Sequence, residues 1–265
     1  MKNMNHAFCG FLSLLVSVSS ANAQLRGSAS ENVRGNLRLE TISIPKEVSK
    51  EFVRLNSEAL LYHPVSSRAE NDPLVIFLHG SGGARRSIEN SRWKREVKPF
   101  VSPKKEYPSV HVLVPQSKGE WDPASLDKML DYVLEMNPGI DANRVYCVGY
   151  SMGGKGTWEW GMRSPKRFAA IIPKGFIPDL ANVKGMVDLP IWAMVGTNDS
   201  KPRSEGIPAM SRALVELGST VVRTTVFEGA NHATAAGKSH QVEGVYEWLF
   251  SHSLPRNQEK AVAGQ

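Results

Sequence analysis

Cysteine is scarce in this chain of 265 residues, which contains only Cys9 and Cys147. Cys9 lies in the N-terminal leader described below, so the mature chain keeps one thiol, which cannot form an intrachain disulfide. Cys147 stands within an apolar run, which predicts a buried structural thiol and not a nucleophile. A hydrophobic core must therefore hold the fold together, and a chain of this length can supply one.

Long runs of one charge are also missing. The 32 Lys and Arg residues and the 26 Asp and Glu residues give a net charge of +6, and the basic residues occur singly or in pairs such as Arg85-Arg86. This pattern argues against nucleic-acid binding. The hydrophobic share of 41% excludes a chain that is disordered throughout. We expect a globular protein.

The N-terminal apolar stretch is too short to span a membrane. It runs from Ala7 to Val18, follows Lys2 and precedes Ala21-Asn22-Ala23, which is the pattern of a secretory signal peptide. A helix of that length would reach about 18 Å, less than the ~30 Å of a hydrocarbon core. We therefore predict cleavage after Ala23, no stable membrane anchor, and a secreted or periplasmic protein.

The rest of the chain is predicted to form one domain. A flexible segment is expected at 24–36, the domain at 37–254 and a flexible tail at 255–265. No Pro/Ser-rich linker, repeat or low-complexity tract interrupts the predicted domain.

Short, continuously apolar runs alternate with amphipathic stretches along this domain. Strands are predicted at 74–78, 110–114, 144–148, 168–172, 191–195 and 220–227. Helices are predicted at 123–135, 152–162, 203–217 and 241–251. Segments 37–44 and 58–62 are expected to add an antiparallel edge. The alternation predicts an α/β fold with a mostly parallel central sheet and helices on both faces, in which ligands bind beyond the carboxyl ends of the strands.

One predicted strand is followed by a motif that is typical of catalytic sites. Residues 149–154 read Gly-Tyr-Ser-Met-Gly-Gly, which fits the G-x-S-x-G nucleophile elbow. The motif stands between a predicted strand and a predicted helix, as the elbow requires. Its glycines leave room for a sharp turn that lifts the hydroxyl above the sheet edge. Ser151 is therefore the predicted nucleophile.

A serine nucleophile needs a base and an acid that orients the base, and in this fold class the order along the chain is serine, acid, histidine. Asp199 follows the strand at 191–195, and His232 follows the strand at 220–227, so these two residues complete the predicted triad. Asp179 is a lesser alternative for the acid. His240 is the rival base, although it is expected at the start of the last helix.

The tetrahedral intermediate of acyl transfer requires donors for its oxyanion. A glycine-rich turn at 79–83, with the sequence His-Gly-Ser-Gly-Gly, follows the strand at 74–78. The backbone amides of Ser81 and Met152 are the predicted donors, with Gly82 as the alternative to Ser81. His79 is expected to brace this loop through hydrogen bonds.

No metal or organic cofactor is expected. The turn at 80–83 lacks the G-x-x-x-x-G-K-[ST] pattern of a phosphate-binding loop, and the sequence contains no H-E-x-x-H motif for zinc. Among the tryptophans, Trp121 is predicted to line the substrate pocket, with core packing as the alternative. Trp158 and Trp160 are expected in the core.

These motifs resemble the α/β-hydrolase superfamily. The similarity runs from Leu74 to Phe250, and its most specific block is 144–158, with the sequence RVYCVGYSMGGKGTW. More narrowly, the chain is similar to secreted bacterial esterases described as predicted peptidases, near the feruloyl-esterase-like and polyhydroxybutyrate-depolymerase-like branches. The resemblance implies that Ser151, Asp199 and His232 are nucleophile, acid and base. Segments 200–203 and 233–234 depart from the pattern of these relatives, so substrate specificity does not transfer.

We therefore expect a secreted serine hydrolase that cleaves carboxylic esters through an acyl-enzyme on Ser151. Its substrate is expected to be a small-molecule or polymer-attached ester, and the sequence leaves the acyl group, the alcohol and the oligomeric state open. A serine peptidase acting on short peptides is one alternative. A catalytically silent envelope- or carbohydrate-binding protein of the same fold is another.

Overall fold

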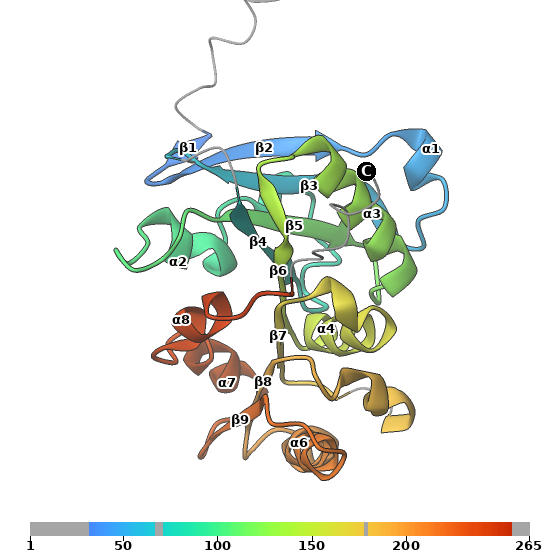
Figure 1. The fold of residues 1–265 in the computed structure, drawn as a ribbon, viewed down its shortest axis with the longest axis vertical. Helices are drawn as coiled ribbons and strands as arrows, with labels where there is room; N and C mark the ends of the chain where they lie inside the picture. The colour runs from blue at the N-terminus through green and yellow to red at the C-terminus, as the bar shows by residue number, and fades with distance from the viewer. Residues whose placement is uncertain (1–31, 67–70, 178–179, 256–265) are drawn as a thin grey trace, which may run out of the picture.

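The structure is a computed structural model that describes residues 32–66, 71–177 and 180–255. Its described strands form one nine-stranded sheet in the order β1-β2-β3-β5-β4-β6-β7-β8-β9 (Figure 1). In chain order these are β1 Val33–Arg34, β2 Leu37–Ser43, β3 Leu55–Pro64, β4 Asp72–Leu78, β5 His111–Ser117, β6 Ile140–Tyr150, β7 Ala170–Lys174, β8 Ile191–Gly196 and β9 Val222–Phe227.

The sheet has an antiparallel edge and a parallel body. Strands β1, β2, β3 and β5 pair antiparallel, whereas every neighbouring pair from β5 through β4 to β9 is parallel. Every residue of β4, β5 and β7 is buried, as expected for strands covered on both faces. The predicted fold class and the predicted antiparallel edge are confirmed.

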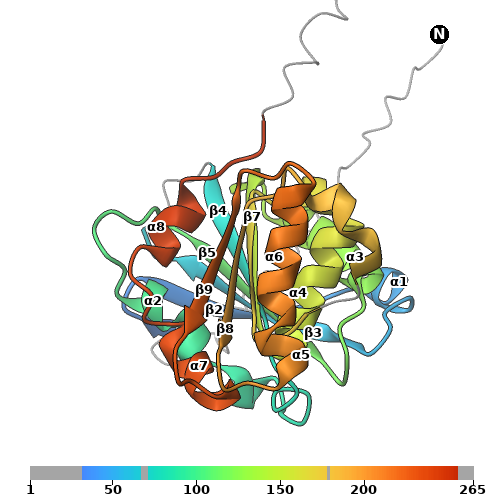
Figure 2. The same ribbon diagram turned by 90° about the horizontal axis from the view of Figure 1, so that it is seen from below.

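Helices cover both faces of the sheet (Figures 1 and 2). Helices α3, α4 and α6 lie over one face, where Met129, Trp158 and Met210 belong to one buried cluster. Helices α2 and α8 lie over the other face, where Phe100 and Tyr246 belong to a second cluster. The helices are α1 Lys46–Ser49, α2 Lys98–Val101, α3 Pro123–Met136, α4 Met152–Arg163, α5 Lys201–Ser204, α6 Gly206–Glu216, α7 His232–Lys238 and α8 Val245–Phe250.

Helix α3 shows how local sequence fixes an element. Asp122 caps it by accepting a hydrogen bond from the backbone N–H of Ser125, and Pro123 occupies the first turn, where no N–H is needed. Residues at 126, 129, 130 and 133 are buried, which is the i, i+3, i+4 spacing of one helix face. The spacing and the cap together explain why this helix begins where the sequence predicts.

Two predicted helices differ in the structure. The stretch at 203–217 forms two helices, α5 and α6, because Pro208 cannot donate to the carbonyl of Ser204 and its ring clashes with that carbonyl. The last helix begins at Val245 and not at 241, since Gly244 takes a left-handed conformation with φ 74°. Helix α7 was not predicted, although Asn231 caps it by accepting from the N–H of Thr234.

The first strand lies ahead of the predicted start of the domain. The N-terminal segment was expected to be flexible to residue 36, but Val33 and Arg34 pair with β2, so this edge of the sheet begins before Leu37. The predicted signal peptide and most of the predicted tail lie outside the described residues. None of the helices that the structure describes combines the length and the hydropathy needed to cross a bilayer.

Candidate active site

Ser151 occupies a sharp turn between β6 and α4. Its backbone has φ 58° and ψ −121°, a combination that side chains rarely adopt and that is tolerated when the surroundings enforce it. The surroundings are close backbone packing. A Cβ at Gly149 would lie 2.1 Å from the carbonyl oxygen of Gly153, and a Cβ at Gly153 would lie 1.9 Å from that of Leu78. Only glycine fits at these two positions, so the predicted elbow is present.

The structure brings the three predicted triad side chains together. The Nε2 of His232 lies 2.9 Å from Oγ of Ser151, and its Nδ1 lies 2.6 Å from a carboxylate oxygen of Asp199. Ser151 follows β6, Asp199 follows β8, and His232 follows β9 as the first residue of α7. Parallel strands end at the same edge of the sheet, which is why residues so far apart in the chain meet.

Asp199 is held as a carboxylate. Its side chain is 2% exposed and accepts hydrogen bonds from Nδ1–H of His232, from the backbone N–H of Ser200 and from Arg203. Burial by itself would raise the pKa of Asp199, but these donors together lower it below its ordinary value. The buried charge is thus fully hydrogen-bonded, and it can orient the imidazole of His232.

Arg203 is a member of the site that sequence reasoning missed. One guanidinium nitrogen lies 3.2 Å from Asp199 and 3.4 Å from Nδ1 of His232, and the guanidinium stands 5.0 Å above the ring of Phe176. It belongs to segment 200–203, where the sequence departs from the family that it resembles. Its position four residues after Asp199, at the start of a helix, is the signal that could have identified it.

Tyr150 is a further residue that contacts His232. Its hydroxyl donates a hydrogen bond to the carbonyl oxygen of His232, and the two rings lie 4.8 Å apart at an angle of 34°. Burial raises the pKa of Tyr150 to about 12, so the hydroxyl remains a donor across the physiological range. Tyr150, the residue before the nucleophile, therefore holds the imidazole of His232 in position. Its place in the G-x-S-x-G motif does not reveal this role.

His79 braces the glycine-rich turn, as predicted. Its Nε2 accepts the backbone N–H of Ser117 at 3.0 Å, so the proton resides on Nδ1, which donates to the carbonyl of Gly80 at 2.9 Å. Burial lowers the pKa of His79, which keeps the ring neutral and this pattern intact. The loop that carries the predicted oxyanion donor is therefore anchored to β5.

The turn at 79–83 lies next to Ser151. A Cβ built on Gly80 would come 3.5 Å from the Cβ of Ser151. Within the described residues, the amides of Ser81 and Gly82 donate to no acceptor, whereas those of Gly83 and Ala84 close the turn. The amide of Met152, the first residue of α4, has no partner within the helix. Ser81, its alternative Gly82 and Met152 thus keep free backbone donors in segments that adjoin Ser151, and the oxyanion hole formed by Ser81 and Met152 remains a prediction.

Trp121 requires a correction. It was predicted to line the substrate pocket, but it is 3% exposed and belongs to the core beneath the site. Its indole N–H donates to the carbonyl oxygen of His79 at 3.1 Å, and its side chain packs against Gly156 of α4. From this position Trp121 supports the glycine-rich turn and cannot reach a substrate.

The remaining candidates fall outside the triad. His240 lies in a turn after α7, where it lines a cavity and makes no contact with Ser151. Asp179 lies outside the described residues. Cys147 is fully buried, which raises the pKa of its thiol to about 12, and Trp158 and Trp160 lie in the core, as predicted. The described residues contain no group of three or more His, Cys, Asp or Glu side chains that could hold a metal ion.

Comparison with known proteins agrees with this geometry. Residues 115–253, more than half of the chain, match the dienelactone hydrolase family. The chain belongs to this family. Its mostly parallel sheet flanked by helices is the α/β-hydrolase fold. No curated protein matches the chain significantly.

The solved structures that resemble this chain include esterases and peptidases. A thermostable esterase is 25% identical, with a TM-score of 0.67 over 82% of this chain and 63% of the esterase. The acylaminoacyl peptidase of Pyrococcus horikoshii is 14% identical, with a TM-score of 0.63 over 87% of this chain and 44% of the peptidase. An arylesterase is 15% identical, with a TM-score of 0.56 over 84% of this chain and 89% of its own. The chain thus spans less than two thirds of the first two proteins, and the last two likenesses concern the fold alone.

Proposed function

We propose that this member of the dienelactone hydrolase family is a serine esterase that acts through an acyl-enzyme on Ser151. The observation that carries the proposal is the continuous hydrogen-bonded array from Ser151 through His232 to Asp199. A serine hydroxyl is a weak nucleophile, and this array supplies both the base and the group that orients the base.

The chemistry follows from the positions of these atoms. Oγ of Ser151 attacks the ester carbonyl carbon while Nε2 of His232 accepts the hydroxyl proton. The carbonyl oxygen becomes an oxyanion, for which the amides of Ser81 and Met152 are the donors. His232 then gives its proton to the departing alkoxide, and the alcohol leaves. Water repeats the sequence on the acyl-enzyme, releasing the acid and restoring the serine.

The experiment must determine whether the enzyme cleaves ester bonds or amide bonds. The 25% identity to a thermostable esterase supports ester hydrolysis, whereas the likeness to a peptidase is one of fold alone. Purified protein should be assayed with acetyl, butyryl, octanoyl and feruloyl esters beside aminoacyl amides and short peptides. Turnover of at least one ester with slower amide cleavage is expected. Faster amide cleavage would establish the peptidase alternative, and no turnover with no labelling by a fluorophosphonate would establish the silent binding protein.

Arg203 should act as a positioning residue within this reaction. Arg203→Met removes one of the three donors to Asp199, so the imidazole is held less firmly. We expect kcat for an activated ester to fall about tenfold with little change in KM. Arg203→Lys, which keeps the charge, should recover part of the loss. Arg212→Met on α6, which removes an exposed arginine, serves as the control. A native kcat in Arg203→Met, with unchanged thermal unfolding, would contradict this role.

We also propose that the protein acts outside the cytoplasm. The support is the leader pattern at 1–23, which no structural observation addresses. Expression of the full chain in a bacterial host should yield exported protein whose first residue is Gln24. Exported protein that still begins at Met1 would show that the leader is not cleaved.

A further inference from the structure

Strand β9 leaves one edge of the sheet unpaired. It stands last in the strand order, at the end of the sheet opposite β1 (Figure 1). It pairs in parallel with β8, and among the described residues no strand lies on its other side. Natural proteins usually guard such an edge with charge, proline or a covering element. The charged residue of β9, Arg223, lies instead over the rings of Trp192 and Trp248, so it leaves the edge open to another strand.

The backbone of β9 presents three outward-facing residues at this edge. The carbonyl oxygens of Val221 and Phe227 accept backbone hydrogen bonds from β8 and from the residue that follows it. The backbone groups of successive residues point to alternate sides of a strand, so those of Val222, Thr224 and Val226 point away from β8. Each of these three residues offers an N–H and a carbonyl to a further strand.

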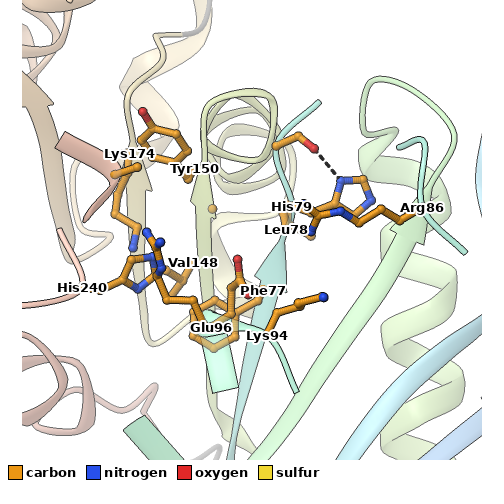
Figure 3. Close-up of a pocket in the computed structure, with 14 residues that line it drawn as sticks. Phe77, Leu78, His79, Arg86, Lys94, Glu96, Val148, Tyr150, Lys174 and His240 are labelled. Carbon is orange, nitrogen blue, oxygen red and sulfur yellow. Dashed lines mark hydrogen bonds between the residues drawn. The ribbon is translucent and has the colours of Figure 1, made fainter. Parts of the chain in front are cut away.

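The same three residues border an apolar groove of about 480 Å³. Helix α6 forms its other wall and lies beside β9 on one face of the sheet (Figure 2). Val215 of α6 and Val226 of β9 are 56% and 44% exposed, although both are apolar. The groove is distinct from the cavity next to the elbow, which Phe77 and Tyr150 line (Figure 3). It therefore belongs to a surface away from the proposed active site.

We propose that a second copy of this chain occupies this edge, with its β9 antiparallel to the first about a two-fold axis at Thr224. The alternate residues Val222, Thr224 and Val226 read the same in both directions. Each Val222 therefore lies opposite Val226 of the second copy, and the outward residues of both strands all pair with one another. Arg223 comes opposite Thr225 of the second copy, so like charges do not face each other. Both copies use the same surface, so the assembly closes as a dimer.

The groove is covered in the same arrangement. Helix α6 lies over β8 and β9, and strands are about 4.8 Å apart, so the axis places the two α6 helices about 10 Å apart. Helices pack at about 8–10 Å. Ser211 marks the level of the axis, because its hydroxyl accepts a hydrogen bond from that of Thr224 at 2.5 Å. Val215, one turn further along α6, then meets Pro208 of the second copy, and apolar side chains of both copies leave water.

The charges of the groove are compatible with this contact. Its charged lining residues are Arg212 and Glu216, one basic and one acidic, so each wall is neutral in sum. Arg212 lies near the axis, where it approaches its counterpart, and Glu216 one turn along the same helix offsets that repulsion. The two walls therefore meet without a net like charge.

The ends of the chain are poorer occupants of this edge. Nine strands leave eight spacings, so β1 and β9 stand roughly 38 Å apart. Segment 24–31, which the proposed cleavage leaves ahead of β1, spans at most about 28 Å when fully extended. The tail at 256–265 contains one β-branched residue, Val262, and no aromatic residue, which disfavours a strand. A second β9, with Val or Thr at four of its six positions, is the better partner.

Sedimentation velocity on native protein tests the proposal directly. At about 10 μM, where most interfaces of standard size are associated, the main species should have twice the mass of the chain. A monomer at this concentration and at one about tenfold higher overturns the proposal. A monomer is also the result expected if the tail at 256–265 covers the edge.

Substitution locates the interface. Val226→Lys places an ammonium opposite Val222 of the second copy, where pairing would bury it without a partner. The dissociation constant of the dimer should rise about a hundredfold or more. Val33→Lys is the matched control and should leave the dimer intact, because Val33 is 41% exposed and lies on β1, the opposite edge strand. A Val226→Lys variant that is folded and still dimeric contradicts the proposal.

A cross-link tests the register and does not depend on a loss of association. The Cα atoms of a hydrogen-bonded antiparallel pair are about 5.5 Å apart, within the range that a disulfide spans. Thr224→Cys should therefore cross-link to its own counterpart under mild oxidation and run as a dimer on a non-reducing gel. Val33→Cys should not, and Cys147 is buried and cannot contribute. A folded Thr224→Cys variant that forms no cross-link contradicts a two-fold axis at this residue.

Discussion

Replacing Ser151 with alanine should lower kcat/KM for an activated ester by about 10⁴-fold or more, while the protein remains folded. The expectation follows from the 2.9 Å contact between Oγ of Ser151 and Nε2 of His232, since without the hydroxyl no acyl-enzyme can form. Labelling by a fluorophosphonate probe should disappear in the same variant. Both readouts should be taken on protein whose thermal unfolding matches that of the native chain.

Ser109→Ala provides the matched control for this experiment. Ser109 is a partly exposed serine two residues before the start of β5, at the opposite edge of the sheet from the site. It should keep native activity and native labelling. If Ser151→Ala kept more than a tenth of the native rate, or still reacted with the probe, the nucleophile would have to be another residue.

Replacing Gly153 with alanine should destabilise the protein by about 3 kcal/mol or more. The new Cβ would lie 1.9 Å from the carbonyl oxygen of Leu78, which is a backbone atom of β4 and cannot move without disturbing the sheet. Denaturant unfolding monitored by tryptophan fluorescence should show a lower midpoint, or the variant should fail to accumulate in soluble form.

Gly237→Ala in α7 separates this effect from the general consequence of replacing a glycine in a helix. A Cβ at Gly237 meets nothing within 4 Å, so this variant should gain roughly 0.5–1 kcal/mol from the better helix propensity of alanine. Equal unfolding midpoints for Gly153→Ala and the native protein would show that the elbow is not packed against β4 as the structure has it.

The sequence by itself predicted the fold class and the three residues of the candidate triad. The reason is that local patterns carry this information: β4, β5 and β7 read as continuous apolar runs because both of their faces are buried. The elbow could be recognised because its glycines are required by backbone contacts within one strand–turn–helix unit. Asp199 and His232 followed from the rule that functional loops lie at the carboxyl ends of parallel strands.

Which side chains contact one another across the fold was determined only by the tertiary structure. Trp121 could have lined a pocket or joined the core, and it is the packing of its indole beneath His79 that buries it. Tyr150 gave no pattern of its own and Arg203 only its i,i+4 spacing from Asp199, since the contacts of both with His232 come from a part of the chain that is distant in sequence. Periodicity reports which face of an element is buried, but the neighbours of one buried side chain depend on how all the elements assemble.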